Sequence, residues 1–189
     1  FADFVLNVPG RHNVSNALAC IAVCHHLGLT VQQMQMGLRH FTGAKRRFEI
    51  LGTCNGALVV DDYAHHPTEV AAVIKAAREG WPNRRIVAVF QPHRYSRTKL
   101  LFDEFTQAFR DADVTIITDI YAPPPEKPIP NVSAAALAER VREQNAPKNV
   151  YHIPKQEDVV PFLRDWVSQG DLVLVMGAGP ISRVAHDLV

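Results

Sequence analysis

The run ALVVDDYAHHPTEVAAVIKAA, residues 57–77, decides the fold class because it passes from a strand directly into a helix. Residues 57–60 are continuously apolar, and residues 70–77 carry apolar side chains at helical spacing. Continuous apolar strands are typical of a parallel sheet that is covered on both faces. Residues 61–69 crowd two aspartates, a tyrosine and two histidines into the turn between them, where open α/β sheets place their ligands.

The same alternation continues along the chain and predicts a doubly wound, mostly parallel α/β sheet. Strands are predicted at residues 47–52, 57–61, 85–90, 113–118, 149–153 and 172–176, and helices near 67–79, 97–110, 133–144, 156–168 and 180–188. Before the sheet, two helices are predicted at 12–28 and 31–40, followed by a connector at 41–47. The chain therefore divides into a short helical part and a larger α/β part.

Strand-to-helix turns of a parallel sheet all lie at one edge, so four segments are expected to converge there. These segments are residues 62–66, 91–97, 119–132 and 177–179. The last of them, Gly-Ala-Gly, is either a plain tight turn or a phosphate-binding turn. It lacks the third glycine of a dinucleotide fingerprint, which favours the plain turn.

Composition sets limits on the class of protein. The 189 residues are enough for one domain, or for one domain and part of another, and the net charge of +1 gives no indication of nucleic acid or an anionic membrane as a partner. No apolar stretch approaches the ~20 residues of a membrane span. Three cysteines without regular spacing favour a reducing, cytoplasmic setting: Cys20 and Cys24 are interpreted as small buried hydrophobes, and Cys54 is placed in a turn. The chain begins at Phe1 without a methionine and is expected to be a fragment.

The segment after the strand at 85–90 offers cationic groups. Arg94 and Arg97, with His93 beside them, suit bidentate recognition of a carboxylate or phosphate. A spacing of three residues at the entry to a helix is expected to place both arginines on one face. The alternative is that either arginine pairs locally on a solvated surface.

The acidic and histidine residues of the other turn leave several roles open. Adjacent side chains point in different directions, so one of His65 and His66 is expected to be structural, and one of Asp61 and Asp62 to face the ligand. Together with His93 they are numerous enough for a metal-dependent phosphoesterase, but no H-E-x-x-H or C-x-x-C spacing is present. A nucleotide-binding regulatory module without chemistry is a further alternative. The pair at 25–26, two histidines without polar neighbours, is interpreted as surface or packing.

Four segments of the chain together resemble the Mur ligases of peptidoglycan synthesis. These are G-R-H-N-V-S-N-A at 10–17, R-R-F at 46–48, D-D-Y-A-H-H-P-T-E-V at 61–70 and Q-P-H-R-Y-S-R-T at 91–98. Within the family, the last two runs are most similar to those of the member that joins L-alanine to UDP-N-acetylmuramate. The resemblance covers essentially the whole chain.

The resemblance implies a place for this chain in a three-domain enzyme. Residues 1–46 would be the end of the central ATP-binding domain, and residues 47–189 the C-terminal Rossmann-like domain that receives the amino acid. No G-x-x-x-x-G-K-[ST] run is present, so ATP phosphates and Mg²⁺ would be held mainly by the missing central portion. The chain alone is expected to be inactive in ligation.

The resemblance also implies roles for individual residues in a reaction that uses ATP, UDP-N-acetylmuramate and L-alanine. Adenine contacts would come from His12, Asn13 and Asn16, a phosphate contact from Arg47, and a ribose contact from Asp62. The acceptor side would consist of Tyr63, His65, His93, Arg94 and Arg97, with a histidine accepting the amine proton and the arginines holding the carboxylate. Which histidine acts as the base is left open.

Two loops depart from the family pattern. The segment 121–126, Tyr-Ala-Pro-Pro-Pro-Glu, lacks the usual Ala-Gly-Glu after the tyrosine, and Pro180 stands where a polar residue is common. The resemblance therefore gives no support for a substrate contact by either loop.

Overall fold

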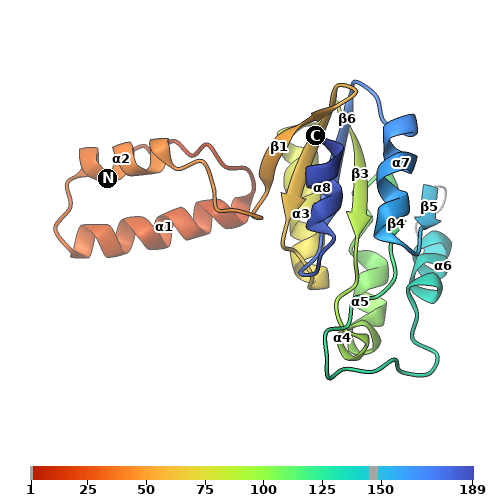
Figure 1. Ribbon diagram of the computed structural model, residues 1–189. Helices are drawn as coiled ribbons and strands as arrows, with labels where there is room; N and C mark the ends of the chain where they lie inside the picture. The colour runs from red at the N-terminus through yellow and green to blue at the C-terminus, as the bar shows by residue number, and fades with distance from the viewer. Residues whose placement is uncertain (1, 145–148) are drawn as a thin grey trace.

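The computed structural model describes residues 2–144 and 149–189. Residue 1 of the predicted first domain and residues 145–148 of the predicted second domain lie outside the described residues. A pair of helices forms an arm that stands beside a body built on one sheet (Figure 1). The helices are α1 Arg11–His26, α2 Val31–His40, α3 Pro67–Gly80, α4 Tyr95–Leu100, α5 Phe102–Gln107, α6 Ala134–Gln144, α7 Gln156–Trp166 and α8 Ser182–Leu188. The strands are β1 Glu49–Cys54, β2 Ala57–Asp62, β3 Arg85–Phe90, β4 Val114–Ile117, β5 Asn149–His152 and β6 Asp171–Met176.

The sheet has the order β1-β2-β6-β3-β4-β5, which confirms the predicted mostly parallel α/β architecture. Among the strand pairs of the described residues, β1–β2 alone is antiparallel. Its two strands are joined through Asn55 and Gly56, whose φ angles of 50° and 82° suit a tight two-residue hairpin. Strand β1 lies two residues later than the predicted strand at 47–52. Cys54 is the last residue of β1 and is buried, so it is not part of the turn. The interpretation of Cys20 as a buried hydrophobe is wrong as well, because Cys20 is exposed on the arm.

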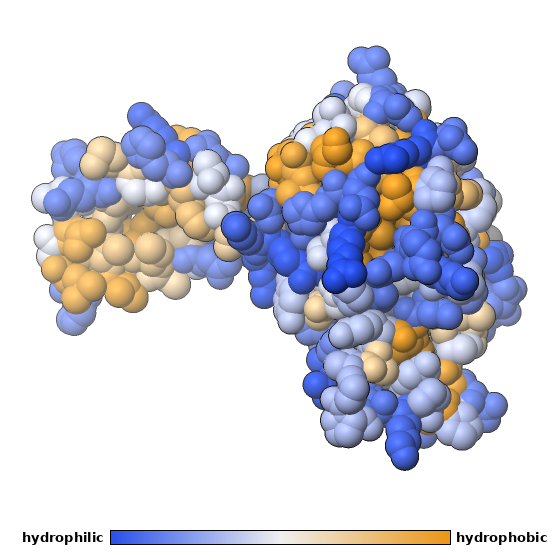
Figure 2. Space-filling model, viewed as in Figure 1, coloured by the Kyte–Doolittle hydropathy of each residue, from blue (hydrophilic) through white to orange (hydrophobic). Residues whose placement is uncertain are grey.

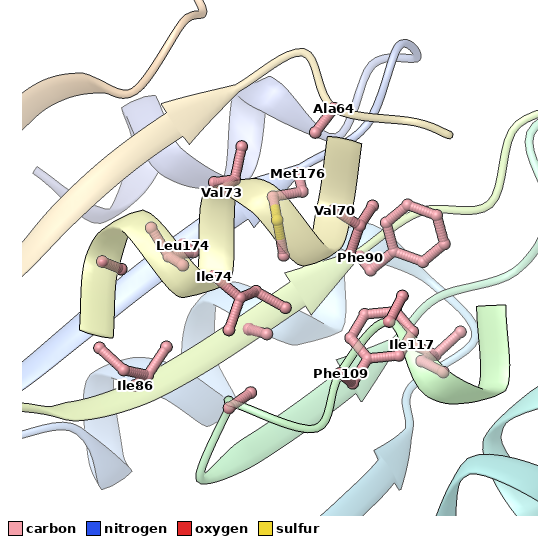
Figure 3. Packing of buried hydrophobic residues seen from close by; sticks show 14 of the residues in the cluster. Ala64, Val70, Val73, Ile74, Ile86, Phe90, Phe109, Ile117, Leu174 and Met176 are labelled. Carbon is pink, nitrogen blue, oxygen red and sulfur yellow. The ribbon is translucent and has the colours of Figure 1, made fainter. Parts of the chain in front are cut away.

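Helices cover both faces of the sheet, as the continuous apolar strands predict. One core joins α3, α5 and α6 to the sheet, and Figure 3 shows Val70 and Ile74 of α3 lying over β3, with Phe90 and Met176 close by. A second core joins α7 and α8 to the opposite face. Each fully buried aliphatic or aromatic side chain contributes roughly 1.5–3 kcal/mol of transfer free energy, so these two layers hold the strand ends in place.

Two helix boundaries bear on the site. Helix α3 begins with a capping box in which the His66 side chain accepts from Thr68 N–H and Glu69 accepts from the His66 backbone. His66 is thus the structural member of the histidine pair. The prediction of a single helix at 97–110 is wrong, because α4 ends at Leu100 and α5 begins at Phe102. The turn at Leu101 lets Leu101 and Phe102 pack on the core, while Leu100 stays 80% exposed.

The arm has little core of its own. Among its described residues only Ala17 of α1 and Met34 of α2 are buried. Apolar side chains that include Val14, Leu18 and Leu27 are exposed, and Figure 2 shows apolar surface on the arm. Within residues 2–144 and 149–189, no helix combines the length and apolarity needed to cross a bilayer.

Candidate active site

The predicted convergence at one edge of the sheet is confirmed by backbone hydrogen bonds between the turns. Gly177 N–H donates to the carbonyl of Asp62 at 3.1 Å, which joins the turns after β6 and β2. Arg94 N–H donates to the carbonyl of Tyr121 at 2.8 Å, which joins the turns after β3 and β4. The polar segments that follow four different strands therefore form one surface.

Four rings gather on this surface. The ring centroids of Tyr63 and His65 lie 5.1 Å apart, those of His65 and His93 6.0 Å apart, and those of His93 and Tyr121 5.8 Å apart. The two histidines come from separate turns and meet edge to face. Three of these four rings belong to the predicted acceptor side, and Tyr121 adds a fourth member that sequence reasoning left out.

The contacts of His65 determine which of its nitrogens carries the proton. Its Nδ1 lies 2.8 Å from the carbonyl oxygen of Tyr63 and 3.4 Å from Oε2 of Glu69. Because both oxygens accept, Nδ1 must donate, and the lone pair of the neutral ring is on Nε2. Partial burial raises the pKa of Glu69, but the backbone N–H groups of His65 and His66 outweigh it, so its pKa lies below the usual range.

His93 has the opposite arrangement. Its Nδ1 lies 3.2 Å from Nη1 of Arg97. A guanidinium only donates, so Nδ1 accepts and the proton of the neutral ring is on Nε2. Burial lowers the pKa of His93, and the charges of Arg97, His65 and Arg94 lower it further. His93 is therefore a neutral ring that offers an N–H at neutral pH.

The arginines reach the site in a way the sequence did not predict. Arg94 has a φ of 72° and precedes α4, so the argument from helical spacing is wrong for it. The loop after β4 supports this turn: Glu126 accepts from the backbone and hydroxyl of Ser96 at 2.8 and 2.5 Å, and these bonds, that of the hydroxyl first, lower the pKa of Glu126. Glu126 thus contacts α4 despite the loop's departure from the family pattern.

Arg46 is a further residue that sequence reasoning missed. Its Nη2 donates to the carbonyl of Gly177 at 2.6 Å, its Nε donates to Oδ2 of Asp61 at 3.2 Å, and its guanidinium carbon lies 5.0 Å from the centre of the Tyr63 ring. Asp61 is fully buried; burial raises its pKa and Arg46 opposes that rise. Arg46 therefore ties the connector to the last strand turn and holds the Tyr63 ring.

The turn at 177–179 is occupied by packing. A Cβ at Gly179 would lie 2.6 Å from Oε1 of Gln91 and 2.8 Å from the Tyr121 ring, and one at Gly177 would lie 2.8 Å from Ile181. Carbonyls of this turn accept from Arg46. These contacts support the plain tight turn that the sequence favoured.

The five residues implied for nucleotide binding line one open hollow of about 970 Å³ between the arm and the body. They are His12, Asn13, Asn16, Arg47 and Asp62. The first three lie on α1, whereas Arg47 is the last residue of the connector and Asp62 is the last residue of β2. An apolar wall that includes Ile21, Leu38 and Phe41 completes the hollow. Such a mixture suits a planar base that carries polar substituents.

The two aspartates at the end of β2 differ as expected. Asp61 contacts Arg46, whereas only Asp62 lines the hollow. Both oxygens of Asp62 also accept backbone bonds, from Phe48 and Ala64 at 2.7 Å each. Burial raises the pKa of Asp62 in spite of these bonds. Asp62 therefore fastens Phe48, the residue after the connector, to the end of β2 and also lines the hollow.

The residues considered as metal ligands do not assemble. Within the part of the chain that the structure describes, no three His, Cys, Asp or Glu side chains form a group able to hold a metal ion. Asp61 and Asp62 are engaged by Arg46 and by backbone N–H groups.

Comparison with known proteins gives consistent matches. The sequence profile described as Mur ligase, glutamate ligase domain, matches residues 46–179. The UDP-N-acetylmuramate–L-alanine ligase of Trichlorobacter lovleyi is 50% identical over 187 residues, which cover 99% of this chain and 41% of the relative. The enzyme of that name from Symbiobacterium thermophilum is 52% identical over 183 residues, covering 97% of this chain and 38% of the relative.

Solved structures give the same result. The UDP-N-acetylmuramate–alanine ligase of Thermotoga maritima has a TM-score of 0.83 at 29% identity, covering 100% of this chain and 39% of that one. A murein peptide ligase from Psychrobacter arcticus has a TM-score of 0.67 at 25% identity, covering 98% of this chain and 38% of that one. The chain thus spans about two fifths of the length of the relatives it matches. With the matched profile, the relatives and the two converging loops in agreement, the chain belongs to the Mur ligase family.

Proposed function

We propose that the chain is the acceptor-binding part, with adjoining helices of the ATP-binding part, of a cytoplasmic ligase that joins L-alanine to UDP-N-acetylmuramate in peptidoglycan synthesis. The observation that carries this proposal is the meeting of the His65 and His93 turns at one sheet edge, in a chain about half identical to ligases of that name. Residues 1–46 belong to the ATP-binding part and residues 47–189 to the acceptor part. The arm and the body of Figure 1 support this division.

The reaction has two steps. ATP phosphorylates the muramoyl carboxylate, giving an acyl phosphate and ADP, and the amine of L-alanine then attacks the activated carbonyl and displaces phosphate. The attacking amine must lose its extra proton. The lone pair on Nε2 of His65, with Glu69 near the opposite nitrogen, makes His65 the base.

The other residues of the acceptor side stabilise negative charge on the intermediate and on L-alanine, or shape the pocket. The Nε2–H of His93 donates to oxygen at the reacting carbonyl, where negative charge grows in the tetrahedral intermediate. Arg94 and Arg97 hold the carboxylate of L-alanine, and Tyr63, fixed beneath Arg46, forms the wall of the acceptor pocket. A cationic rim of this kind favours an amino acid over a simple amine.

The nucleotide occupies the hollow between arm and body. Side-chain amides of Asn13 and Asn16 present both donors and acceptors to the adenine edge, with His12 beside the base. Arg47 reaches toward the phosphates and Asp62 toward the ribose. Mg²⁺ is assigned mainly to the central portion that carries the phosphate loop in this proposal, and to none of the residues named here.

A domain graft tests the proposal. The 189-residue chain replaces the matching segment of the Trichlorobacter lovleyi ligase, and phosphate release and product are measured with ATP, UDP-N-acetylmuramate and L-alanine. The graft is expected to ligate, whereas the chain alone releases no phosphate in the presence of L-alanine. A graft that folds and binds ATP but forms no product contradicts the proposal, as does ligation by the chain alone.

A further inference from the structure

The backbone of Arg94 has a conformation that residues other than glycine rarely adopt. Its φ of 72° and ψ of 133° lie outside the three regions that are allowed for a residue with a Cβ atom. Such a conformation costs conformational free energy, and it persists only where the surrounding contacts determine it. A glycine would remove this cost, but it would also remove the guanidinium that the proposed acceptor site uses.

The backbone reversal at Arg94 determines where the second arginine of the acceptor side lies. Helix α4 starts directly after the reversal, and Nη1 of Arg97 comes back to 3.2 Å from Nδ1 of His93. This contact joins the residues on either side of Arg94, so its length depends on the backbone conformation between them. A relaxed Arg94 would move both guanidinium groups relative to His93.

Backbone hydrogen bonds from two directions hold the reversal. Tyr121, in the loop after β4, forms an isolated parallel bridge with His93: its N–H donates to the carbonyl of Pro92 at 2.9 Å, and its carbonyl accepts from Arg94 N–H at 2.8 Å. On the other side, the buried Thr98 donates its N–H and its hydroxyl to the carbonyl of Arg94, at 3.0 and 2.9 Å. The conformation of Arg94 therefore depends on both the loop and the first turn of α4.

Glu126 joins that loop to the first turn of α4 through its side chain. Its Oε1 accepts from the backbone N–H of Ser96 at 2.8 Å and from the Ser96 hydroxyl at 2.5 Å. The N-cap residue of α4 is Arg94, whose side chain makes no capping hydrogen bond. The carboxylate of Glu126 takes the place of the missing cap, and its negative charge suits the start of a helix. Without it, the first turn of α4 loses an acceptor and the reversal before it can relax.

We propose that Glu126 is a positioning residue of the acceptor site. It holds the first turn of α4, and through that turn the strained Arg94, so that Arg94 and Arg97 meet the carboxylate of the amino acid together. This inference rests on the proposed function, which assigns the two arginines to that carboxylate. The affinity for the acceptor thereby depends on the loop between β4 and α6, although Glu126 itself does not touch the substrate.

The kinetic test uses the graft with ATP saturating and L-alanine varied. Glu126→Ala is expected to raise KM for L-alanine about three-fold or more, with kcat and KM for ATP nearly unchanged. Glu126→Gln keeps an oxygen that accepts from Ser96 N–H, so it should restore most of the affinity for L-alanine. An equal rise in both variants overturns the proposal, because the charge of Glu126 and not its hydrogen bond would then matter.

A matched control removes a glutamate that lies away from the site. Glu139 is exposed on α6 and pairs with Arg142 of the same helix. Glu139→Ala is expected to leave KM for L-alanine unchanged. A rise equal to that of Glu126→Ala overturns the proposal, because it would reflect a general response of the domain to the loss of a carboxylate.

Amide hydrogen exchange in the chain itself tests the positioning without reference to activity. In Glu126→Ala, the N–H groups of Arg94 and Thr98, which Glu126 does not contact, should exchange about ten-fold faster or more, with exchange in α3 unchanged. Unchanged exchange at Arg94 and Thr98 overturns the proposal, and so does faster exchange throughout α3, which would indicate a general loss of stability. Failure of the proposed function is distinguishable, because the graft would then not ligate with Glu126 in place.

Discussion

Replacing His65 and His93 in turn by glutamine distinguishes a histidine that acts as a base from one that acts as a hydrogen-bond donor. His65 has its lone pair on Nε2 because Nδ1 donates to the Tyr63 carbonyl, whereas His93 has its proton on Nε2 because Nδ1 accepts from Arg97. A glutamine amide presents an N–H close to the Nε2 position and has no basic nitrogen. The same substitution therefore removes the role of His65 and keeps most of the role of His93.

The expected magnitudes differ accordingly. A positioned general base contributes about 10²–10⁴-fold to rate, so His65→Gln should lower kcat by about that factor. His93→Gln retains a neutral donor and loses only its alignment; a loss of up to about 1.4 kcal/mol corresponds to ten-fold or less. The two variants should thus differ by at least ten-fold in kcat.

The assay is steady-state phosphate release by the graft with ATP saturating. Nitrogen-15 NMR of the imidazoles checks the tautomers in the chain itself, with protonated Nδ1 in His65 and protonated Nε2 in His93. A larger loss for His93→Gln than for His65→Gln, or exchanged tautomers, would refute the reasoning.

Three further outcomes are expected. Asp62→Asn should weaken ATP binding by the graft more than Asp61→Asn does, and equal losses of ATP affinity would contradict the assignment of Asp62 to the nucleotide. Asp62→Asn should also lower the free energy of unfolding by about 1–3 kcal/mol, because one buried backbone N–H loses its acceptor. Arg94→Ala or Arg97→Ala should raise KM for L-alanine about ten-fold or more, since each charged hydrogen bond is worth about 1.5–3 kcal/mol. The KM for ATP should stay nearly unchanged, and a rise in that KM instead would place the two arginines at the nucleotide. Folding lowers the pKa of His93, so its contribution to stability is present above the unfolded pKa of about 6.5 and is lost as pH falls through the folded pKa. The free energy of unfolding in urea should therefore depend less on pH over that range in His93→Gln than in the parent chain.

Much of the architecture can be predicted from local patterns in the sequence. Continuous apolar runs such as residues 172–176 predict central parallel strands, and helical spacing predicts the layers above and below them. Since parallel strands end at a common edge, the meeting of the turns at 62–66 and 91–97 also follows from topology alone. Short-range periodicity is sufficient for these inferences, because side-chain burial follows the repeat of the backbone.

Other features depend on contacts between distant residues, and only the tertiary structure decided them. Arg46 meets Gly177 across 131 positions, and the Tyr121 ring lies tilted beside His93 although its loop departs from the family pattern. The helix break at Leu101 depends on which side chains reach the core. The division of labour between the two histidines depends on the partner of each Nδ1, a carbonyl for one and a guanidinium for the other. The sequence by itself determined which chemical groups reach the edge of the sheet; the proton on each ring is set by neighbours that only folding brings within hydrogen-bonding distance.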